Sequence, residues 1–194
     1  MRVFKGRDST GVRGIDLKDG DSVIGMGVLR HVDVTTEEVR AYFKWDSQNR
    51  GDVEVEDEEA PAASGEEAAV PFERLVWLKS QEQFILAVTS TGVGKRASAY
   101  EYRVTNRGGK GLIAHRLTGD ARLIASFPVK ESEELLLVTD KGQLIRTGVD
   151  QIRIAGRATQ GVILINVAED EHVVAAERLE VLTGAEAEAE EGGE

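Results

Sequence analysis

The fold is decided by two stretches that align without a gap at an offset of 50 residues: ILAVTSTGVGKRASAYEYRVTNRGGKGLI (residues 85–113) and LLLVTDKGQLIRTGVDQIRIAGRATQGVI (residues 135–163). Matched positions are Leu86 with Leu136, Val88 with Val138, Thr89 with Thr139, Gly92 with Gly142, Arg96 with Arg146, Arg103 with Arg153, Arg107 with Arg157 and Gly111 with Gly161. Self-similarity at such a fixed period indicates a repeat architecture, in which each unit is one supersecondary element.

A third, truncated copy opens the chain. In the segment RVFKGRDSTGVRGI, Arg7 and Gly11 lie 100 residues before Arg107 and Gly111. The same pair of residues therefore recurs at three places, two periods and then one period apart.

The local pattern within a repeat is that of β-strands. Apolar runs such as FILAVT, LLLVT and VILINV are separated by turns that contain glycine, and Gly92 and Gly142 stand where a tight hairpin needs a positive φ. After the basic segment we expect a further strand, an Asp-containing turn, and another strand at 123–127 or 173–176. A period near 50 with about four strands is typical of a propeller-like blade, so we predict an all-β fold of about three blades in an incomplete ring with open sheet edges.

Three segments depart from this pattern. Thr35 and Glu38 have the spacing of a capping box, which predicts a short helix ahead of an acidic stretch. That stretch and the acidic tail are expected to be disordered because they hold too few apolar residues to offset the entropy of ordering. The predicted domains are a partial blade with following strands and the short helix (1–50), the acidic insert (51–71), two blades (72–183) and the acidic tail (184–194).

The net charge of −11 is unevenly distributed. Residues 51–70 hold eight acids and no bases, and residues 184–194 hold five acids and no bases. By contrast, residues 71–167 carry fourteen Lys and Arg against nine Asp and Glu. The body of the protein is thus mildly basic, and its total charge does not exclude a nucleic-acid partner.

The segment Asn106–Gly111 is the candidate binding element. Its glycines leave the backbone bare, so a phosphate could approach the main-chain N–H groups while Arg107 and Lys110 supply charge. A glycine-rich turn with solvated cations explains the segment equally well, but its recurrence at Arg7 and Arg157 favours a basic track. The candidate DNA-binding residues are Arg7, Arg13, Lys95, Arg96, Arg103, Arg107, Gly108, Gly109, Lys110, Arg146, Arg153 and Arg157.

No other site is expected in this sequence. A nucleotide-binding loop is excluded at 89–96 because Thr89 replaces its first glycine and Arg96 follows its lysine. His31, His115 and His172 lack partners at metal-ligand spacing, so neither a metal site nor a catalytic centre is predicted. No apolar run is long enough to span a membrane, there is no signal peptide, and cysteine is absent, which together predict a cytoplasmic protein.

The segments RVFKGRDSTGVRGI, GKRASAYEYRVTNRGGKG and RIAGRATQGVILINV resemble the carboxy-terminal β-pinwheel of DNA gyrase A subunits over nearly all of the chain except the insert and tail. The family's diagnostic box reads Gln-Arg-Arg-Gly-Gly-Arg/Lys-Gly, and residues 105–111 keep five of its seven positions. The resemblance therefore implies a later blade, with the full box and the catalytic-tyrosine region expected upstream of Met1. Tyr42, Tyr100 and Tyr102 are not expected to take the catalytic role.

The resemblance also implies a function. Such domains bind and wrap duplex DNA without sequence preference, and the holoenzyme introduces negative supercoils with ATP and Mg on other domains, so this chain itself is expected to hold no cofactor. The implied partners are double-stranded DNA, the rest of gyrase A and gyrase B in an A2B2 assembly, associated with the bacterial nucleoid. Two alternatives stay open: the related domain of the topoisomerase IV A protein, and a β-propeller scaffold that binds proteins.

Overall fold

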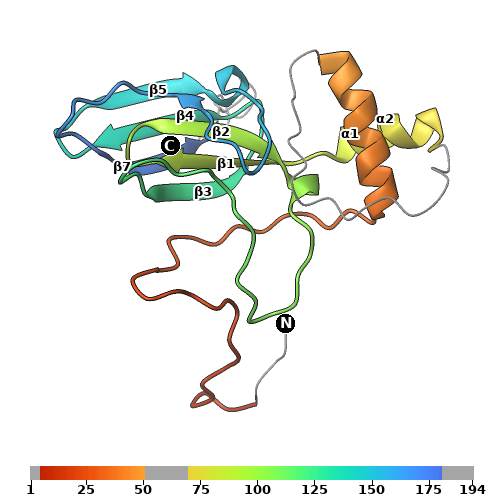
Figure 1. Cartoon of the computed structure of the whole chain (residues 1–194), viewed down its shortest axis with the longest axis horizontal. Coiled ribbons are helices and arrows are strands. Elements are labelled where there is room, and N and C mark those ends of the chain that lie inside the picture. Colours follow the sequence, from red (N-terminus) through yellow and green to blue (C-terminus); the bar gives the residue numbers. More distant parts are fainter. Residues whose placement is uncertain (1–4, 51–69, 181–194) are drawn as a thin grey trace, which may run out of the picture.

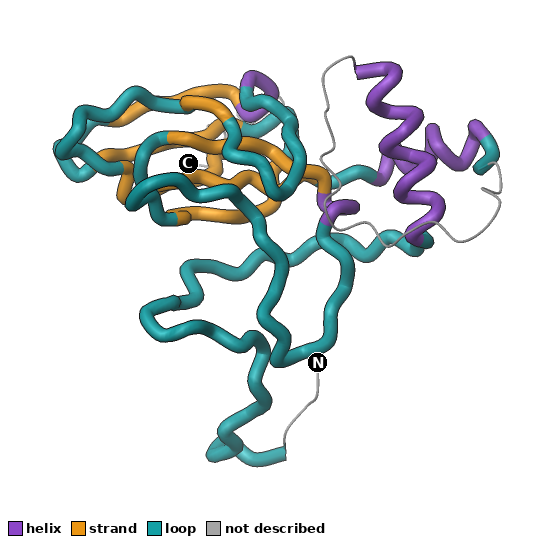
Figure 2. The backbone as a smooth tube through the Cα atoms, viewed as in Figure 1, coloured by secondary structure: helices purple, strands orange, loops and turns teal. Residues whose placement is uncertain are grey.

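A computed structural model describes residues 5–50 and 70–180 (Figure 1). The strands gather at one end and the two helices at the other, while residues 5–34 run as an extended chain below them (Figure 2). The elements are α1 (Thr36–Arg50), α2 (Phe72–Gln81), β1 (Phe84–Thr89), β2 (Val93–Ser98), η1 (Ala99–Glu101), β3 (Leu123–Val129), β4 (Glu134–Thr139), β5 (Leu144–Gly148), η2 (Val149–Gln151), β6 (Val162–Ile163) and β7 (Val173–Leu179). The predicted disordered tail, 184–194, and all but residues 70 and 71 of the predicted disordered insert lie outside the described residues.

The strands form two antiparallel sheets with the same internal register. Sheet A has the order β3-β1-β2-β6, and sheet B has the order β5-β4-β7. Phe84 pairs with Ser98 and Val129 in sheet A, and Glu134 pairs with Gly148 and Leu179 in sheet B, each partner lying 50 residues later. Even the irregularity in the outer pair recurs, after Val88 and after Val138. The repeat seen in the sequence is therefore a repeat of strand pairing.

The hairpin of each sheet closes through a threonine and a glycine. The hydroxyl of Thr89 accepts a hydrogen bond from the Val93 amide at 3.2 Å, and that of Thr139 accepts one from the Gln143 amide at 3.0 Å. Gly92 and Gly142 have φ of 77° and 82°, a region that residues with a Cβ rarely adopt. The predicted hairpins are confirmed.

One apolar core joins the two sheets. Leu135, Leu137 and Thr139 alternate with more exposed positions along β4, so that one face of this strand is buried. The core contains Leu86, Val88, Val129, Leu135, Leu137, Val149, Ile152, Ile165, Val173 and Ala176. Because both sheets contribute, the two repeats are packed against each other and form an open, mostly β structure of the predicted class.

The backbone also repeats in the truncated first copy. Gly11, Gly111 and Gly161 all have positive φ, of 79°, 79° and 88°. A strand was expected after each basic segment, and this was largely wrong: the third copy contributes only β6, and the described parts of the first and second copies contribute none there. The reason is that β6 does not pair with the strands of its own repeat, which form sheet B, but with β2 of sheet A. The equivalent residues of the earlier copies have no such edge beside them in the described part of the chain.

The helices are inserted into a turn between repeats. In the tight turn that joins β3 to β4, the Lys130 amide donates to the Glu133 carboxylate at 2.7 Å. The equivalent residues, Arg30 and Gln83, make the same contact at 2.8 Å, and the Gln83 side chain also donates to the Arg30 carbonyl at 2.8 Å. The chain thus leaves the β framework at Arg30 and rejoins it at Gln83, with its two ends held together.

The first helix of this insertion was predicted and the second was not. The predicted capping box at the start of α1 is confirmed, since the Thr35 amide donates to Glu38 at 2.8 Å and the Glu38 amide donates to the Thr35 hydroxyl at 3.2 Å. Residues 72–81, expected to belong to a blade, form α2 instead. No side chain caps this ten-residue helix, which is held by packing of its buried leucines beside Tyr42 of α1. Its sequence does carry helix signals that the prediction missed, Glu73 in the first turn and Lys79 in the last.

Candidate nucleic-acid interface

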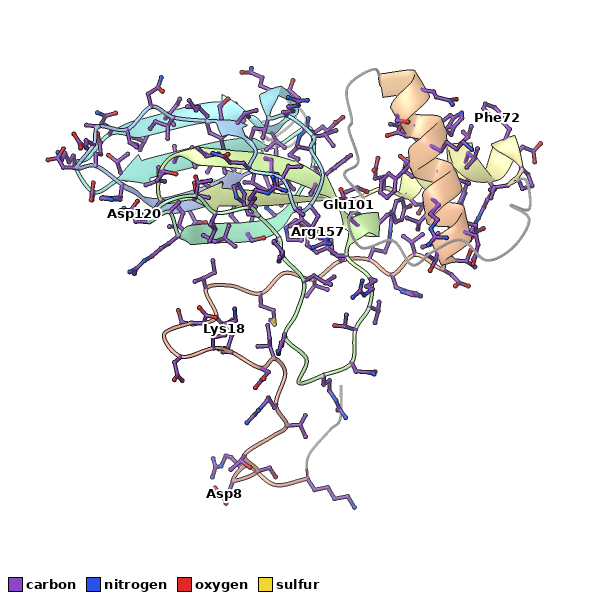
Figure 3. All side chains as sticks on the ribbon, viewed as in Figure 1. Asp8, Lys18, Phe72, Glu101, Asp120 and Arg157 are labelled. Carbon is purple, nitrogen blue, oxygen red and sulfur yellow. The ribbon has the colours of Figure 1, made fainter. Side chains whose placement is uncertain are left out.

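Three basic turns occupy equivalent positions in the repeats: Arg7–Asp8, Arg107–Gly108 and Arg157–Ala158. The side chains of Arg7 and Arg107 are exposed, and that of Arg157 is half-buried. Figure 3 shows Arg157 beside the sheets and Asp8 at the far end of the extended region. The repeat thus spreads its cations along the molecule and does not gather them in one pocket.

Hydrogen bonds link successive basic turns. The Gly108 amide donates to the Gly14 carbonyl at 2.9 Å, and the Asp16 amide donates to the Gly109 carbonyl at 2.9 Å, which joins the second turn to the first copy. The guanidinium of Arg157 donates to the carbonyl of Ile113, which joins the third turn to the second copy. The second and third turns are therefore each fixed to the copy that precedes them.

The second turn is largely exposed to solvent. Arg103, Arg107 and Lys110 are all exposed, and the intervening Val104 is 93% exposed. Arg13 lies on the neighbouring extended segment of the first copy and is exposed as well, and it forms an ion pair with Asp16 at 2.9 Å. These four cations are exposed on the glycine-rich segment and on the first-copy segment that bonds to it, as expected for contacts with a phosphate backbone.

The segment that carries the third turn is hydrogen-bonded to the outer edge of β2. The Arg96 amide donates to the Arg153 carbonyl at 2.9 Å and the Ala155 amide donates to the Arg96 carbonyl at 2.8 Å, and β6 pairs with Val93 and Gly94 further along the same edge. The segment between these two attachments carries Arg157. Glycine is required at 94, since a Cβ there would lie 2.7 Å from the Ala87 carbonyl oxygen of β1, and it would also meet the side chain of Leu164.

Lys95 is not a DNA contact, which corrects the prediction from the sequence. Its side chain is 0% exposed, and its Nζ donates to the carbonyls of Gly156, Arg157 and Thr159 at 2.6, 2.5 and 2.7 Å. Burial lowers the pKa of Lys95 to about 8, and the negative charge of Glu101 partly opposes this effect. Lys95 thus holds the third basic turn from its buried side.

Arg96 is also removed from the candidate contacts. It is 4% exposed, and its guanidinium donates to the carbonyls of Ile152 and Asp150 at 2.7 and 3.1 Å and to Glu131 at 3.0 Å. Its repeat partner Arg146 is exposed and pairs with Glu134 across the hairpin. The same residue type differs in role because a segment docks on β2, whereas none docks on the outer edge of β5 in the described residues.

One functional residue was missed from the sequence. Glu101 accepts a hydrogen bond from the Arg157 amide at 2.5 Å, and the two residues lie close together in Figure 3. An acidic residue ahead of a basic loop gave no signal, because its partner lies 56 residues away in the chain.

Arg153, the remaining predicted residue, is exposed on the segment that docks on β2.

Residues 5–50 and 70–180 contain no helix long and apolar enough to cross a membrane. In the same residues, no three His, Cys, Asp or Glu side chains gather where they could hold a metal ion.

Comparison with known proteins places the repeats in one family. The family model described as "DNA gyrase C-terminal domain, beta-propeller" matches residues 3–30, 83–130 and 133–180, which leaves the helical insertion outside. The DNA gyrase A protein of Granulibacter bethesdensis is 44% identical over 184 residues, covering 89% of this chain and 20% of that protein. The DNA gyrase A protein of Rickettsia bellii is 41% identical over 179 residues, covering 91% of this chain and 19% of the relative.

Solved structures with a similar fold include a C-terminal domain of DNA topoisomerase IV, with a TM-score of 0.48, 22% identity, and coverage of 51% of this chain and 30% of that one. A DNA gyrase A C-terminal domain has a TM-score of 0.46, 21% identity, and coverage of 50% and 34%. The chain spans about a fifth of the length of the curated gyrase A relatives that it matches. On the family match and these identities, the chain belongs to the DNA gyrase A family, in the part that forms the C-terminal β-pinwheel.

Proposed function

We propose that this chain binds and wraps duplex DNA without sequence preference, as the C-terminal part of a gyrase A protein. The observation that carries this proposal is the succession of linked basic turns at Arg7, Arg107 and Arg157. Cations repeated along a surface neutralise successive phosphates, and the additional contacts that a bend permits offset the energy of bending the DNA. The proposed contacts are Arg7, Arg13, Arg103, Arg107, Gly108, Gly109, Lys110, Arg146, Arg153 and Arg157.

The activity of the whole enzyme is proposed to lie elsewhere. Negative supercoiling would use ATP and Mg bound by other domains, a catalytic tyrosine in another part of gyrase A, and gyrase B in an A2B2 assembly on the bacterial nucleoid. Within the family, the names of the curated relatives favour gyrase over topoisomerase IV.

The test measures binding of this chain to short duplexes of unrelated sequence across a range of salt. Equal affinities and a steep, linear fall of log K with log salt are expected, because binding releases counterions. In R107A the slope should decrease by about 0.9, since one phosphate contact is lost. R122A is the matched control, because Arg122 is exposed on the turn before β3, outside the proposed contacts, and removes the same charge.

Strong preference for one base sequence, or no binding at about 50 mM salt, would contradict the proposal.

A second candidate, a scaffold that binds a protein, is favoured by one feature. On α2, Phe72, Val76 and Trp77 are 65%, 45% and 41% exposed, and apolar residues grouped on a surface mark protein contacts. Undiminished DNA binding by R107A, together with a protein partner lost on V76D, would favour this second function.

A further inference from the structure

The segment that carries the third basic turn is a loop closed against β2 at both ends. Arg153 and Ala155 bond to Arg96 at one end, and the Leu164 amide donates to the Gly92 carbonyl at 2.8 Å at the other. Between these attachments no strand pairing holds residues 156–160. Two backbone hydrogen bonds hold it, from the Thr159 amide to the Gly156 carbonyl and from the Arg116 amide to the Thr159 carbonyl, each at 3.1 Å, and side chains make its remaining contacts.

Lys95 lies between the two attachments and meets the turn with a matched number of donors. An ammonium group has three N–H donors, and three carbonyls lie within 2.7 Å of its Nζ, with the Thr159 hydroxyl at 3.2 Å. Carbonyls replace the water that this fully buried charge has lost. One charged group thereby binds three parts of the turn.

Glu101 holds the turn from a second element. It belongs to η1, and it accepts the Arg157 amide at 2.5 Å, while the carbonyl of Arg157 accepts from Lys95 at 2.5 Å. Both polar groups of the Arg157 backbone are therefore bound by ionised side chains of the preceding repeat. Such charge-assisted hydrogen bonds are about twice as strong as neutral ones.

The third repeat shows what these positions become when no turn is docked. The equivalents of Lys95 and Glu101 are Ile145 and Gln151, and the equivalent of Gly94 is Leu144, which is 61% exposed. No segment pairs with the outer edge of β5 in the described residues. The lysine, the glutamate and the glycine thus occur together, beside the strand edge that carries a basic turn.

From these contacts we infer that Lys95 and Glu101 are positioning residues, which hold the Arg157 turn of the next repeat in the conformation that presents it to a phosphate backbone. This role rests on the proposed DNA binding, although neither residue touches DNA. A buried lysine of one repeat would in this way decide how well the basic turn of its neighbour binds.

The experiment compares K95M and E101Q with wild type in the complete chain, by amide hydrogen exchange and by DNA binding. Met has the length of Lys without its charge, and K130M is the control that removes the same charge from an exposed position. We expect exchange at 157–160 to become at least about tenfold faster in K95M and E101Q, with β1 and β4 protected as before, since the turn opens locally. K130M should match wild type.

For DNA, K95M should bind about eightfold more weakly at 0.1 M salt, with a slope lower by about 0.9, as expected if one ordered phosphate contact is lost. Unchanged exchange at 157–160 in both variants would overturn the inference, and so would wild-type DNA binding by both. If K95M does not fold, the test rests on E101Q, because Glu101 is only half-buried. A wild-type chain that does not bind DNA overturns the proposed function, while the exchange measurement still decides whether these side chains hold the turn.

Discussion

Glu38 connects the two inserted helices through a single residue, Arg74. Its carboxylate accepts from the Arg74 guanidinium at 2.8 Å and from the Thr35 amide at 2.8 Å. The guanidinium in turn lies 4.3 Å from the ring of Trp77. One carboxylate thus caps α1, orients Arg74 and, through it, places the indole of α2.

This arrangement predicts a pH dependence. The hydrogen bond from Arg74 is the main cause that lowers the pKa of Glu38 below 4.5, followed by that from Thr35. A carboxyl group whose pKa is lower in the folded state stabilises the fold above its unfolded pKa, and this contribution is lost as pH falls through the lowered value. The packing of the helices, followed by tryptophan fluorescence, should therefore weaken below about pH 4.5 in wild type.

In E38Q the helices should be less stable at neutral pH, and the part of the acid transition due to Glu38 should vanish. E37Q is the matched control, because Glu37 is an exposed neighbour in the same helical turn. An identical acid transition in wild type and E38Q would contradict the assignment.

Individual residues differed in how far the sequence could predict them. Thr35 and Glu38 act within one turn of chain, so their spacing was sufficient. Lys95 was assigned to the DNA surface because its burial depends on Gly156–Thr159, about sixty residues later, and local sequence does not encode what docks on a strand.

At the level of elements, the edges of β2 and β5 are equivalent in sequence position but not in environment. The short strand β6 from the next repeat covers β2, whereas β5 ends sheet B. The surroundings of the glycines that precede the two strands show whether a segment lies against each edge. A Cβ at Gly92 would lie 2.3 Å from the Ile165 carbonyl oxygen, and a Cβ at Gly142 would have nothing within 4 Å.

A comparison of G92A with G142A therefore separates the loss of stability due to backbone strain from the loss due to disturbing the segment docked at Gly92. Both glycines have positive φ, of 77° and 82°, so each alanine should lower the free energy of unfolding by about 1–2 kcal/mol through backbone strain. G92A should lower it further, because the Ile165 backbone must move away and the Leu164–Gly92 hydrogen bond is weakened. Urea unfolding measures both. Equal losses in the two variants would show that the segment containing Ile165 does not rest on Gly92.

The strand pairs were predictable because the 50-residue offset carries complete hairpins, with their turn glycines, from one sheet to the other. The docking of β6 was not, since Val162 and Ile163 form a strand of two residues whose partner is outside their own repeat. Helix α2 escaped prediction for a related reason: its stability comes from packing, and Pro71 at its start offers no side-chain cap.

At the level of the whole molecule, charge is segregated along the chain. Residues 184–194 contain five acids and no bases, whereas successive turns of the described repeats carry cations, exposed at Arg7 and Arg107 and half-buried at Arg157. A tethered run of carboxylates competes with phosphate for the same cations, and its effective concentration is high. The overall charge of −11 is therefore compatible with a basic binding surface.

Removal of residues 184–194 is expected to tighten DNA binding, with the largest gain at low salt, where electrostatic competition is least screened. Binding isotherms at several salt concentrations measure this effect. The matched control keeps the tail but replaces its five glutamates with glutamine, and it should bind as tightly as the truncated chain. Unchanged affinity in both would show that the tail does not compete.

Because the ends of the insertion are joined at Arg30 and Gln83, this turn is a site where another polypeptide segment could be inserted. The Gln83 side chain closes this junction as the Glu133 carboxylate closes the neighbouring turn at Lys130, and the inserted helices touch the repeat that follows at Tyr100, whose hydroxyl donates to the Leu78 carbonyl at 2.8 Å. Each doubling of the intervening length would cost only about 0.6 kcal/mol in loop entropy. A different module, such as a fluorescent reporter, could replace the helices at this junction if it also covered Tyr100 and so left Glu101 and the third basic turn in place.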